Sequence, residues 1–397
     1  MKYVILVPDG MADEPVAQLN GKTPLQAANT PNMDYLAQNG YCGQVQTIPD
    51  GLPPGSDIGN LSLMGYDPLT NFSGRACLEA ANMGIMLDVD EVAFRCNLVT
   101  VVDGKMVDYS AGHITTEEAK ILIEDLERAI SWPDVRFYAG KSYRHIMVSK
   151  TISVERLLKV RTTPPHDILN QPIKDHLPAG PQSEILLSLM EKAKNFLELH
   201  QINKIRQEND DQPANHIWLW GQGSHPELPS FKKMHQLSGS VISAVDLVNG
   251  IGRLAGLEVV TVPGANGYYD TNYKGKAEFA LDSLKRHDFV YVHVEAPDEA
   301  GHNGDLKAKM QCIERFDQEV VGTILNYFGK GQARILVAPD HPTPVAKRCH
   351  TRAAVPFVMF GPGISPNGTG EYSEAAASGI GLKFKSGQEM VQYFLKP

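Results

Sequence analysis

Short apolar runs alternate with segments of helical periodicity along most of this 397-residue chain. Each run has the length of one strand, and the segments between runs repeat apolar residues every three to four positions. This alternation is typical of an α/β domain with a mainly parallel sheet flanked by helices. Strands are predicted at residues 2–7, 217–220, 241–243, 259–262, 289–294 and 335–338. Helices are predicted at residues 32–39, 61–64, 77–83 and 306–328.

The pattern changes at about residue 88, where β-rich segments replace the regular alternation. Strands predicted at 92–102, 136–138 and 145–148 enclose an amphipathic helix at 116–129, and a further helix is predicted at 183–206. A polar linker from Glu208 to Pro213 precedes the return of the α/β pattern. The sequence therefore predicts a discontinuous α/β domain, residues 1–87 and 216–397, with a smaller α+β domain inserted at 88–215.

Composition narrows the class of partner. The net charge of −9 argues against nucleic acid or an anionic membrane as the main partner. No apolar stretch approaches the roughly 18–20 residues that a membrane span requires. The five cysteines are scattered and form no C-x-x-C pair, which fits a reducing compartment. We therefore expect a soluble, cytoplasmic protein that acts on a small molecule; the sequence does not indicate its oligomeric state.

Acidic residues and histidines follow the predicted strands at the positions where those strands end. Asp9 follows the first strand, Asp298 follows the strand at 289–294, and Asp340-His341 follows the strand at 335–338. Loops after parallel strands converge at the carboxyl edge of the sheet, and carboxylate oxygen with imidazole nitrogen suits divalent cations. The seven candidate ligands are Asp9, Ser56, Asp298, His302, Asp340, His341 and His350. They suffice for two ions about 4 Å apart, as in phosphoryl-transfer sites.

Each of these residues also has an ordinary structural explanation. Asp9-Gly10 suits a tight turn, Asp298 suits a helix N-cap, and His350 suits the surface. Ser56 follows prolines and Gly55 directly before a predicted helix, so it is either an N-cap or a nucleophile activated by the helix N-terminus and a metal. The joint pattern is much less probable by chance than any single residue, and it favours the metal site.

Several motifs along the chain resemble one known family. They are Val7-Pro8-Asp9-Gly10, Gly21 to Leu25, Asn29 to Asp34, Pro54-Gly55-Ser56-Asp57, Gly65-Tyr66-Asp67-Pro68, His293 to His302 and Pro339-Asp340-His341. They are similar to motifs of the archaeal-type, cofactor-independent phosphoglycerate mutases of the alkaline phosphatase superfamily. The resemblance implies an alkaline-phosphatase-like fold and two divalent ions, usually manganese, although zinc or magnesium would also suit the ligands.

The resemblance also implies a role for each ligand. Asp9, Ser56, Asp340 and His341 would hold one metal, and Asp298, His302 and His350 would hold the other. Ser56 would take the phosphoryl group from 3-phosphoglycerate and return it to the 2-hydroxyl of the same glycerate, without bisphosphoglycerate. If the inserted domain closes over this site, Gly84-Ile85 and Gly221 to Gly223 are the candidate hinges.

Such a reaction needs cationic groups that hold a carboxylate and a phosphate. The candidates are Arg95, His113, Arg144, His145, Lys274 and Lys276, with Arg75, Arg348 and Arg352 as further possibilities. A solvated surface cation is the simpler explanation for each of them taken alone.

One departure leaves the substrate open. Archaeal-type mutases tend to carry Ala-His where this chain has Gly59-Asn60, and related bacterial sequences have been suspected of being homoserine kinases. The chain has no P-loop, and Gly250-Ile251-Gly252 follows a helical pattern and indicates helix packing. A phosphatase that uses the same serine is a further alternative, and a non-catalytic binding module is the weakest. The inserted domain favours a sealed site and therefore a mutase.

Overall fold

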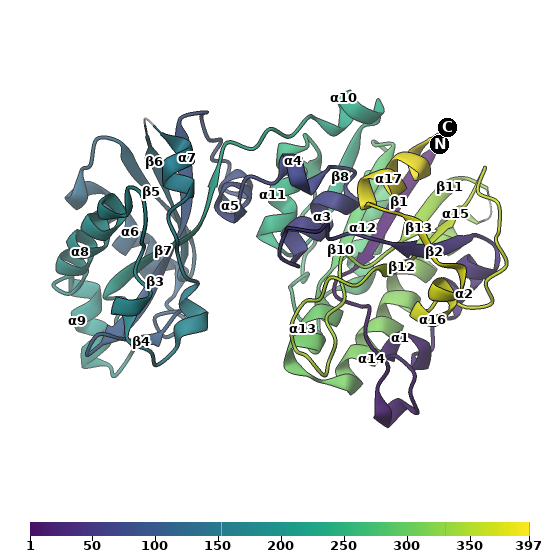
Figure 1. The fold of residues 1–397 in the computed structure, drawn as a ribbon, viewed down its shortest axis with the longest axis horizontal. Helices are drawn as coiled ribbons and strands as arrows, with labels where there is room; N and C mark the ends of the chain where they lie inside the picture. Colours follow the sequence, from purple (N-terminus) through teal and green to yellow (C-terminus); the bar gives the residue numbers. More distant parts are fainter. Residues whose placement is uncertain (152, 330, 397) are drawn as a thin grey trace. The chain divides into compact units, whose positions relative to one another are not determined.

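A computed structural model describes residues 1–151, 153–329 and 331–396 of the chain, which divides into two compact units (Figure 1). The main unit combines Met1–Phe72 with the segment that begins at Leu228, and the inserted unit is Ser73–Glu227. Each unit has its own hydrophobic core. Within the described ranges, no helix is both long and apolar enough to cross a bilayer.

The main unit is built on a sheet with the strand order β13-β2-β12-β11-β1-β10-β8-β9. The strands are β1 Lys2–Pro8, β2 Tyr41–Val45, β8 Gly239–Ile242, β9 Glu258–Val259, β10 Phe289–Val294, β11 Ala333–Val337, β12 Val355–Phe360 and β13 Leu382–Phe384. Among the described strands of this sheet, only β12 runs antiparallel to its neighbours. The prediction of a mainly parallel α/β sheet is therefore confirmed.

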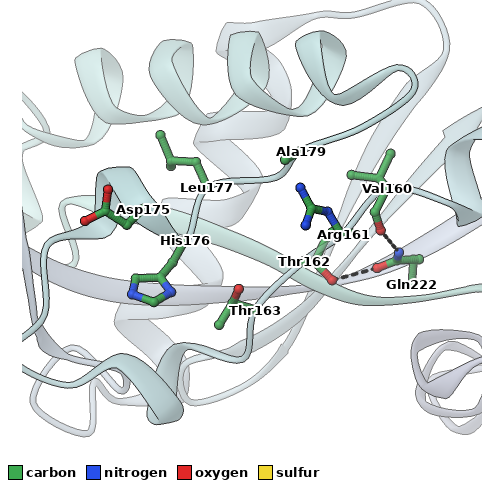
Figure 2. A pocket seen from close by; sticks show the side chains of 9 residues that line it. All are labelled: Val160, Arg161, Thr162, Thr163, Asp175, His176, Leu177, Ala179 and Gln222. Atoms are coloured by element: carbon green, nitrogen blue, oxygen red, sulfur yellow. Dashed lines mark hydrogen bonds between the residues drawn. The ribbon is translucent and has the colours of Figure 1, made fainter.

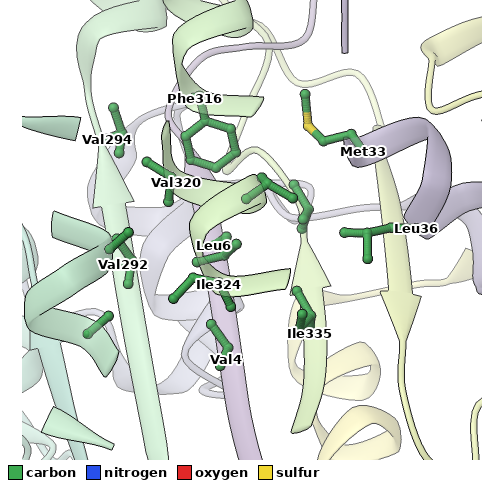
Figure 3. Packing of buried hydrophobic residues seen from close by; sticks show 14 of the residues in the cluster. Val4, Leu6, Met33, Leu36, Val292, Val294, Phe316, Val320, Ile324 and Ile335 are labelled. Atoms are coloured by element: carbon green, nitrogen blue, oxygen red, sulfur yellow. The ribbon is translucent and has the colours of Figure 1, made fainter. Parts of the chain in front are cut away.

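The central strands are apolar along nearly their whole length because helices cover both of their faces. In β1, every residue after Lys2 is buried. Val4 and Leu6 of β1 pack with Val292 of β10 and Ile335 of β11 in one cluster (Figure 3). The same view shows Phe316 covering these strands from the long helical segment. This packing fixes the strand ends that carry the acidic residues.

The helices of the main unit fill the connections between strands. Their bounds are α1 Pro24–Ala27, α2 Pro31–Gln38, α3 Ser56–Leu63, α4 Pro68–Asn71, α10 Phe231–His235, α11 Asp246–Leu254, α12 Tyr273–Ser283, α13 Ala296–Asn303, α14 Leu306–Arg315, α15 Gly322–Phe328, α16 Glu374–Ile380 and α17 Gly387–Leu395. A π-helical segment, Phe316–Val321, joins α14 to α15, so the helix predicted at 306–328 is continuous but not uniform. Gly252 lies in α11 against Val241, which confirms helix packing for the glycines there.

The inserted unit is an antiparallel sheet covered by helices. Its strands are β3 Glu91–Val102, β4 Lys105–Asp108, β5 Val135–Lys141, β6 Arg144–Lys150 and β7 His216–Ser224, and its helices are α5 Arg75–Asn82, α6 Thr116–Ile130, α7 Val154–Leu158, α8 Ser183–Leu197 and α9 Gln201–Glu208. A capping box between Thr115 and Glu118 begins α6. The single helix predicted at 183–206 is wrong, because His200 accepts a hydrogen bond from the Ile202 amide and starts a separate helix.

The inserted unit begins earlier and ends later than the predicted 88–215. Helix α5 packs against β3 and β7 of this unit, and Gly74 pairs with Gly223 in a β-bridge. The chain therefore crosses between the units at 72–73 and 227–228. The predicted hinges, Gly84-Ile85 and Gly221 to Gly223, lie inside the inserted unit.

A buried ion pair in the main unit gives the first testable prediction. Lys309 is fully buried and donates hydrogen bonds to Asp13 Oδ2 at 2.7 Å and to the Thr343 carbonyl oxygen at 2.7 Å. Lys309→Met would leave the Asp13 carboxylate buried without a countercharge, so we expect a loss of about 3–5 kcal/mol in stability. Hydrogen exchange of the β1 and β10 peptides, read by mass spectrometry, measures this loss within the main unit.

Two variants control this experiment. Asp13→Asn in the Lys309→Met background removes the unpaired charge and should restore much of the protection. Lys274→Met breaks an exposed pair with Glu278 on α12 and should change stability by less than about 1 kcal/mol. Equal effects of Lys309→Met and Lys274→Met would contradict the assignment.

Candidate active site

The acidic residues meet at the carboxyl edge of the main sheet. β1 pairs in parallel with both β10 and β11, so the residues that follow these three strands lie next to one another. Asp9 follows β1 directly, and Asp340 follows β11. Asp298 and His302 lie one turn apart on α13, which begins two residues after β10. The convergence expected from the sequence is therefore present.

The innermost group consists of Asp9, Asp340 and His341, whose ligand atoms all lie within 4.8 Å of one another. His341 Nε2 is 3.6 Å from Asp9 Oδ1 and 3.4 Å from Asp340 Oδ2. Asp9 Oδ1 is buried and has no hydrogen-bond partner. Burial, followed by the nearby carboxylates of Asp340 and Asp298, raises the pKa of Asp9 well above its usual value. A buried carboxylate oxygen without a donor is the arrangement that a cation would complete.

The second group lies nearer to solvent and consists of Asp298, His302, His341 and His350. His302 Nε2 is 3.2 Å from Asp298 Oδ2 and 2.8 Å from His350 Nε2, and His350 Nε2 is 3.5 Å from Asp298 Oδ1. The ligand atoms of Asp298, His341 and His350 also lie within 4.8 Å of one another. His341 therefore belongs to both groups, whereas the resemblance assigned it to the first ion alone.

The protonation state of His302 affects how well the second group can bind a metal ion. The hydrogen bond to Asp298 raises the pKa of His302 to about 9. His302 Nδ1 lies 3.1 Å from the Arg348 carbonyl oxygen and donates to it, so Nε2 faces Asp298 and His350. A cation bound there must displace the proton from Nε2, which makes its affinity fall as pH decreases.

Both groups combine carboxylate oxygen with imidazole nitrogen, a set that suits Mn²⁺, Zn²⁺ or Mg²⁺. Glu295 adds a further acidic group, and burial followed by repulsion from Asp298 raises its pKa to about 8. The buried oxygen of Asp9 and the crowding of three aspartates show that the residues fit divalent cations.

Ser56 borders the inner group. It is the first residue of α3, and its Oγ is 3.2 Å from His341 Nε2. Gly55 occupies the N-cap position, and no side chain caps this helix, so the hydroxyl is not used as a cap. The alternative explanation of Ser56 as an N-cap is therefore wrong. The hydroxyl faces the metal-ligand cluster at the positive end of a helix, where negative charge is stabilised.

Three residues that sequence reasoning missed hold the ligands in place. His293 Nε2 is 3.0 Å from Asp9 Oδ2, and the Thr343 hydroxyl donates to Asp298 Oδ1. Asn60 Nδ2 donates to Asp340 Oδ2 at 2.8 Å. Helical spacing offered a signal for Asn60, which lies four residues after Ser56. The contacts of His293, which lies in β10, and of Thr343, which follows β11, arise only when separate elements meet in the fold.

Gly59 explains how closely α3 approaches Asp340. A Cβ atom added at this position would lie 2.9 Å from the Asp340 Cβ and 2.6 Å from its carbonyl oxygen. Glycine is therefore needed for packing. Gly59 and Asn60, which stand where archaeal-type mutases tend to carry Ala-His, both contact Asp340. They can therefore affect the position of a candidate metal ligand.

The two candidate lysines of the main unit differ in burial. Lys276 is fully buried and donates to the His293 carbonyl oxygen at 2.9 Å, and burial lowers its pKa to about 8. This contact supports β10. Because the Lys276 ammonium group is buried, a substrate cannot reach it in this conformation, contrary to the predicted substrate-binding role. Lys274 is exposed and pairs with Glu278. Of the further possibilities, the Arg352 guanidinium donates to the Leu52 carbonyl oxygen.

The candidates of the inserted unit fall into buried and exposed pairs. Arg95 is buried, forms a 3.0 Å ion pair with Glu79 and stacks on Trp220. His113 and Arg144 both lie against the ring of Tyr143 at the exposed end of this unit's sheet. His145 is buried, and burial lowers its pKa to about 3, so it is neutral. The expectation that His145 supplies a positive charge is therefore wrong.

His145 instead predicts a pH dependence of stability. The unfolded state binds a proton at His145 below pH 6.5, whereas the folded state does not until about pH 3. Stability is therefore fully present above pH 6.5 and falls as pH decreases. Between pH 7 and pH 5, protonation of His145 in the unfolded state lowers the free energy of unfolding by about 2 kcal/mol. All three tryptophans lie in the inserted unit, so urea titrations followed by tryptophan fluorescence report on this unit.

The His145→Asn variant isolates this contribution. The asparagine oxygen replaces Nδ1, which accepts a hydrogen bond from the Gly140 amide at 3.0 Å, but it does not titrate. The loss of stability between pH 7 and pH 5 should be about 2 kcal/mol smaller in this variant. The same slope in both proteins would show that His145 is protonated in the folded state.

A cavity of about 560 Å³ in the inserted unit has none of the candidate metal ligands or substrate-binding residues in its lining (Figure 2). Its lining includes Thr162 and Gln222, and the Thr162 hydroxyl donates to Gln222 Oε1 at 2.8 Å. Gln222 Nε2 donates in turn to the Val160 carbonyl oxygen. Thr162 and Gln222 therefore bond within the chain, and Arg161, Asp175 and His176 also line the cavity.

Comparison with known proteins identifies the family. A family model described as 2,3-bisphosphoglycerate-independent phosphoglycerate mutase matches residues 37–203. The chain is 49% identical to a protein of that name from Methanothrix thermoacetophila over the full length of both. A solved structure of a Pyrococcus horikoshii protein is 31% identical, with a TM-score of 0.84, over 99% of this chain and 96% of that one. A cofactor-independent phosphoglycerate mutase from Thermoplasma acidophilum is 27% identical, with a TM-score of 0.68, over 100% of this chain and 99% of that one. The chain therefore belongs to the family of 2,3-bisphosphoglycerate-independent phosphoglycerate mutases.

Proposed function

We propose that this protein interconverts 3-phosphoglycerate and 2-phosphoglycerate through a phosphoserine at Ser56, without bisphosphoglycerate. The observation that carries the proposal is the Ser56 hydroxyl, 3.2 Å from His341 Nε2 at the edge of two metal-ligand groups. The names of the full-length relatives support the same reaction.

The residues have distinct roles in this proposal. Asp9, Asp340 and His341 hold the inner cation beside Ser56, and Asp298, His302 and His350 hold the outer one. Bound divalent cations, with manganese the first choice, lower the pKa of the serine hydroxyl and neutralise charge on the phosphoryl group. Ser56 Oγ loses its proton and attacks phosphorus, the ester bond to the glycerate 3-oxygen breaks, and that oxygen takes up a proton. The 2-hydroxyl then loses its proton and attacks the phosphoserine, and the bond to Ser56 Oγ breaks to restore the serine.

The inserted unit is proposed to bind the substrate and exclude water. Arg144 and His113 are the preferred contacts for carboxylate and phosphate because both are accessible and flank Tyr143. Arg95 supports the sheet beneath them through its ion pair with Glu79. Lys274 is a weaker candidate because it already pairs with Glu278. The free cysteines are consistent with the proposed cytoplasmic location.

The kinase alternative arose from Gly59-Asn60. Packing against Asp340 accounts for both residues without a different acceptor. We therefore do not favour homoserine kinase. Phosphatase activity is the alternative that the assay must exclude, because a phosphatase would use the same serine and metals.

Phosphorus NMR of the manganese-loaded protein tests the proposal. With 3-phosphoglycerate alone, we expect 2-phosphoglycerate to form without added bisphosphoglycerate. Added ¹³C-labelled glycerate should not enter the product, because the reaction is intramolecular. Release of free phosphate alone would identify a phosphatase, and O-phosphohomoserine formed from homoserine and ATP would identify a kinase.

A further inference from the structure

Asn60 is a buried amide whose hydrogen bonds join the nucleophile's helix to a metal ligand. Its Nδ2 group donates to the Ser56 carbonyl oxygen at 2.8 Å and to Asp340 Oδ2 at 2.8 Å. Its Oδ1 accepts a hydrogen bond from the Tyr291 hydroxyl at 2.6 Å. Both Asn60 and Tyr291 are fully buried. One side chain therefore contacts Ser56, the first residue of α3, and Asp340 in the loop after β11.

Two acceptors determine which way the amide points: the Ser56 carbonyl oxygen and Asp340 Oδ2 both face its nitrogen, and the Tyr291 hydroxyl donates to its oxygen. Burial, followed by the nearby carboxylates of Asp340 and Asp9, raises the pKa of Tyr291 well above its usual value, so the hydroxyl keeps its proton. A hydroxyl can donate or accept, and beside the amide oxygen it donates, at 2.6 Å, which holds the nitrogen toward Asp340. The opposite orientation would set an amide oxygen against a carboxylate oxygen, with no proton between them.

The same contacts restrict the lone pairs that Asp340 offers. Asp340 Oδ1 accepts hydrogen bonds from the Gly10 amide at 3.2 Å and from the His341 amide at 3.0 Å. Oδ2 accepts one hydrogen bond, from Asn60. One lone pair of Oδ2 is therefore left, on the atom that lies 3.4 Å from His341 Nε2.

We propose that Asn60 is a positioning residue, which fixes Asp340 as a single-oxygen ligand for a divalent cation and ties that ligand to the helix of Ser56. Tyr291 acts through Asn60 by holding its amide oxygen with a hydrogen bond. Gly59 permits the arrangement because it lets α3 approach Asp340. The proposal deepens the proposed function, since it rests on a cation beside Ser56, but it concerns binding of that cation and not the substrate.

Calorimetric titration of the metal-free, full-length protein with Mn²⁺ tests the proposal without turnover. Asn60→Ala should weaken Mn²⁺ binding by about 10–100-fold, the usual effect of losing a residue that orients a ligand. In the mutase assay kcat should fall, while KM for 3-phosphoglycerate should stay within about twofold. Tyr291→Phe should weaken binding in the same direction but less.

Non-additivity separates positioning from general destabilisation. Tyr291→Phe should have no further effect on Mn²⁺ affinity in the Asn60→Ala background, because its effect passes through the amide. Asn203→Ala is the matched control: this buried asparagine donates to the Leu197 and Ala214 carbonyl oxygens in the inserted unit. It should lower stability and leave Mn²⁺ affinity unchanged.

Wild-type Mn²⁺ affinity in Asn60→Ala, or additive effects of the two substitutions, would overturn the proposal. If Asn60→Ala does not fold, the Mn²⁺ affinity of Tyr291→Phe tests the proposal instead. An unchanged affinity in that variant would overturn the role of Asn60 and Tyr291. If Mn²⁺ affinity depends on Asn60 in this way but the protein forms no 2-phosphoglycerate, the proposed function is refuted and this inference stands.

Discussion

Ser56→Ala is expected to abolish formation of 2-phosphoglycerate, with a loss of at least about 10⁴-fold in kcat. In the proposed mechanism, the substitution removes the atom that carries the phosphoryl group between the two positions. The Thr343 hydroxyl also lies 3.2 Å from His341, but from Nδ1, and it donates to Asp298 Oδ1. Asp9, Asp340 and the outer group remain, so metal content should fall little. Phosphorus NMR measures turnover, and elemental analysis measures bound metal.

The matched control is Ser62→Ala in the same helix. Ser62 is buried and accepts a hydrogen bond from the Gly387 amide at 3.1 Å, so its loss affects packing and not the reaction. Acid quenching of the wild-type protein during turnover should also yield a peptide phosphorylated at Ser56. Full activity in Ser56→Ala, or a phosphopeptide from another residue, would remove Ser56 from the mechanism.

His341→Ala is expected to have the second large effect, and it differs from Ser56→Ala because metal is lost as well. His341 contributes to both ligand groups, with Nε2 3.6 Å from Asp9 and 3.4 Å from Asp340. We expect both cations to bind at least about 10-fold more weakly and activity to fall with them. Metal per chain after dialysis against Mn²⁺, measured together with kcat, tests this coupling.

Two further variants distinguish the inner ligand group from the outer one. His302→Ala should lower the metal content by one ion, because His302 contacts only Asp298 and His350 of the ligand set. Loss of both ions in His302→Ala would contradict the division into groups. His287→Ala is the control, since His287 precedes β10 at the opposite edge of the sheet and pairs with Glu258. It should retain metal and activity.

The pH dependence of metal binding follows from His302, whose pKa the hydrogen bond to Asp298 raises to about 9 in the metal-free protein. Below that pH a cation must displace the proton, so outer-site affinity should rise between pH 6 and pH 8. His302→Ala should flatten this rise. The inner group should respond less, because burial lowers the pKa of His341.

Local sequence rules determined most of the elements of this protein. Continuous apolar runs marked β1, β10 and β11, because strands covered on both faces need apolar residues at every position. Asp9, Asp298 and Asp340 could be assigned to one edge since each follows a parallel strand. The four-residue spacing placed Asp298 and His302 on one helix face. The pattern did not reveal β2 and β12, whose pairing partners lie more than 300 residues apart.

Tertiary structure alone decided how these elements are used. His145 and Lys276 resemble other cationic residues in the sequence, but burial makes one neutral and gives the other a main-chain partner. The inserted unit extends beyond its predicted bounds because α5 packs on β7. The contacts of Asn60 with Asp340 and Tyr291 join residues 280 and 231 positions apart. Sequence fixes which chemical groups a segment carries, whereas burial and long-range hydrogen bonds set their charge and orientation, and these depend on segments that meet only in the folded chain.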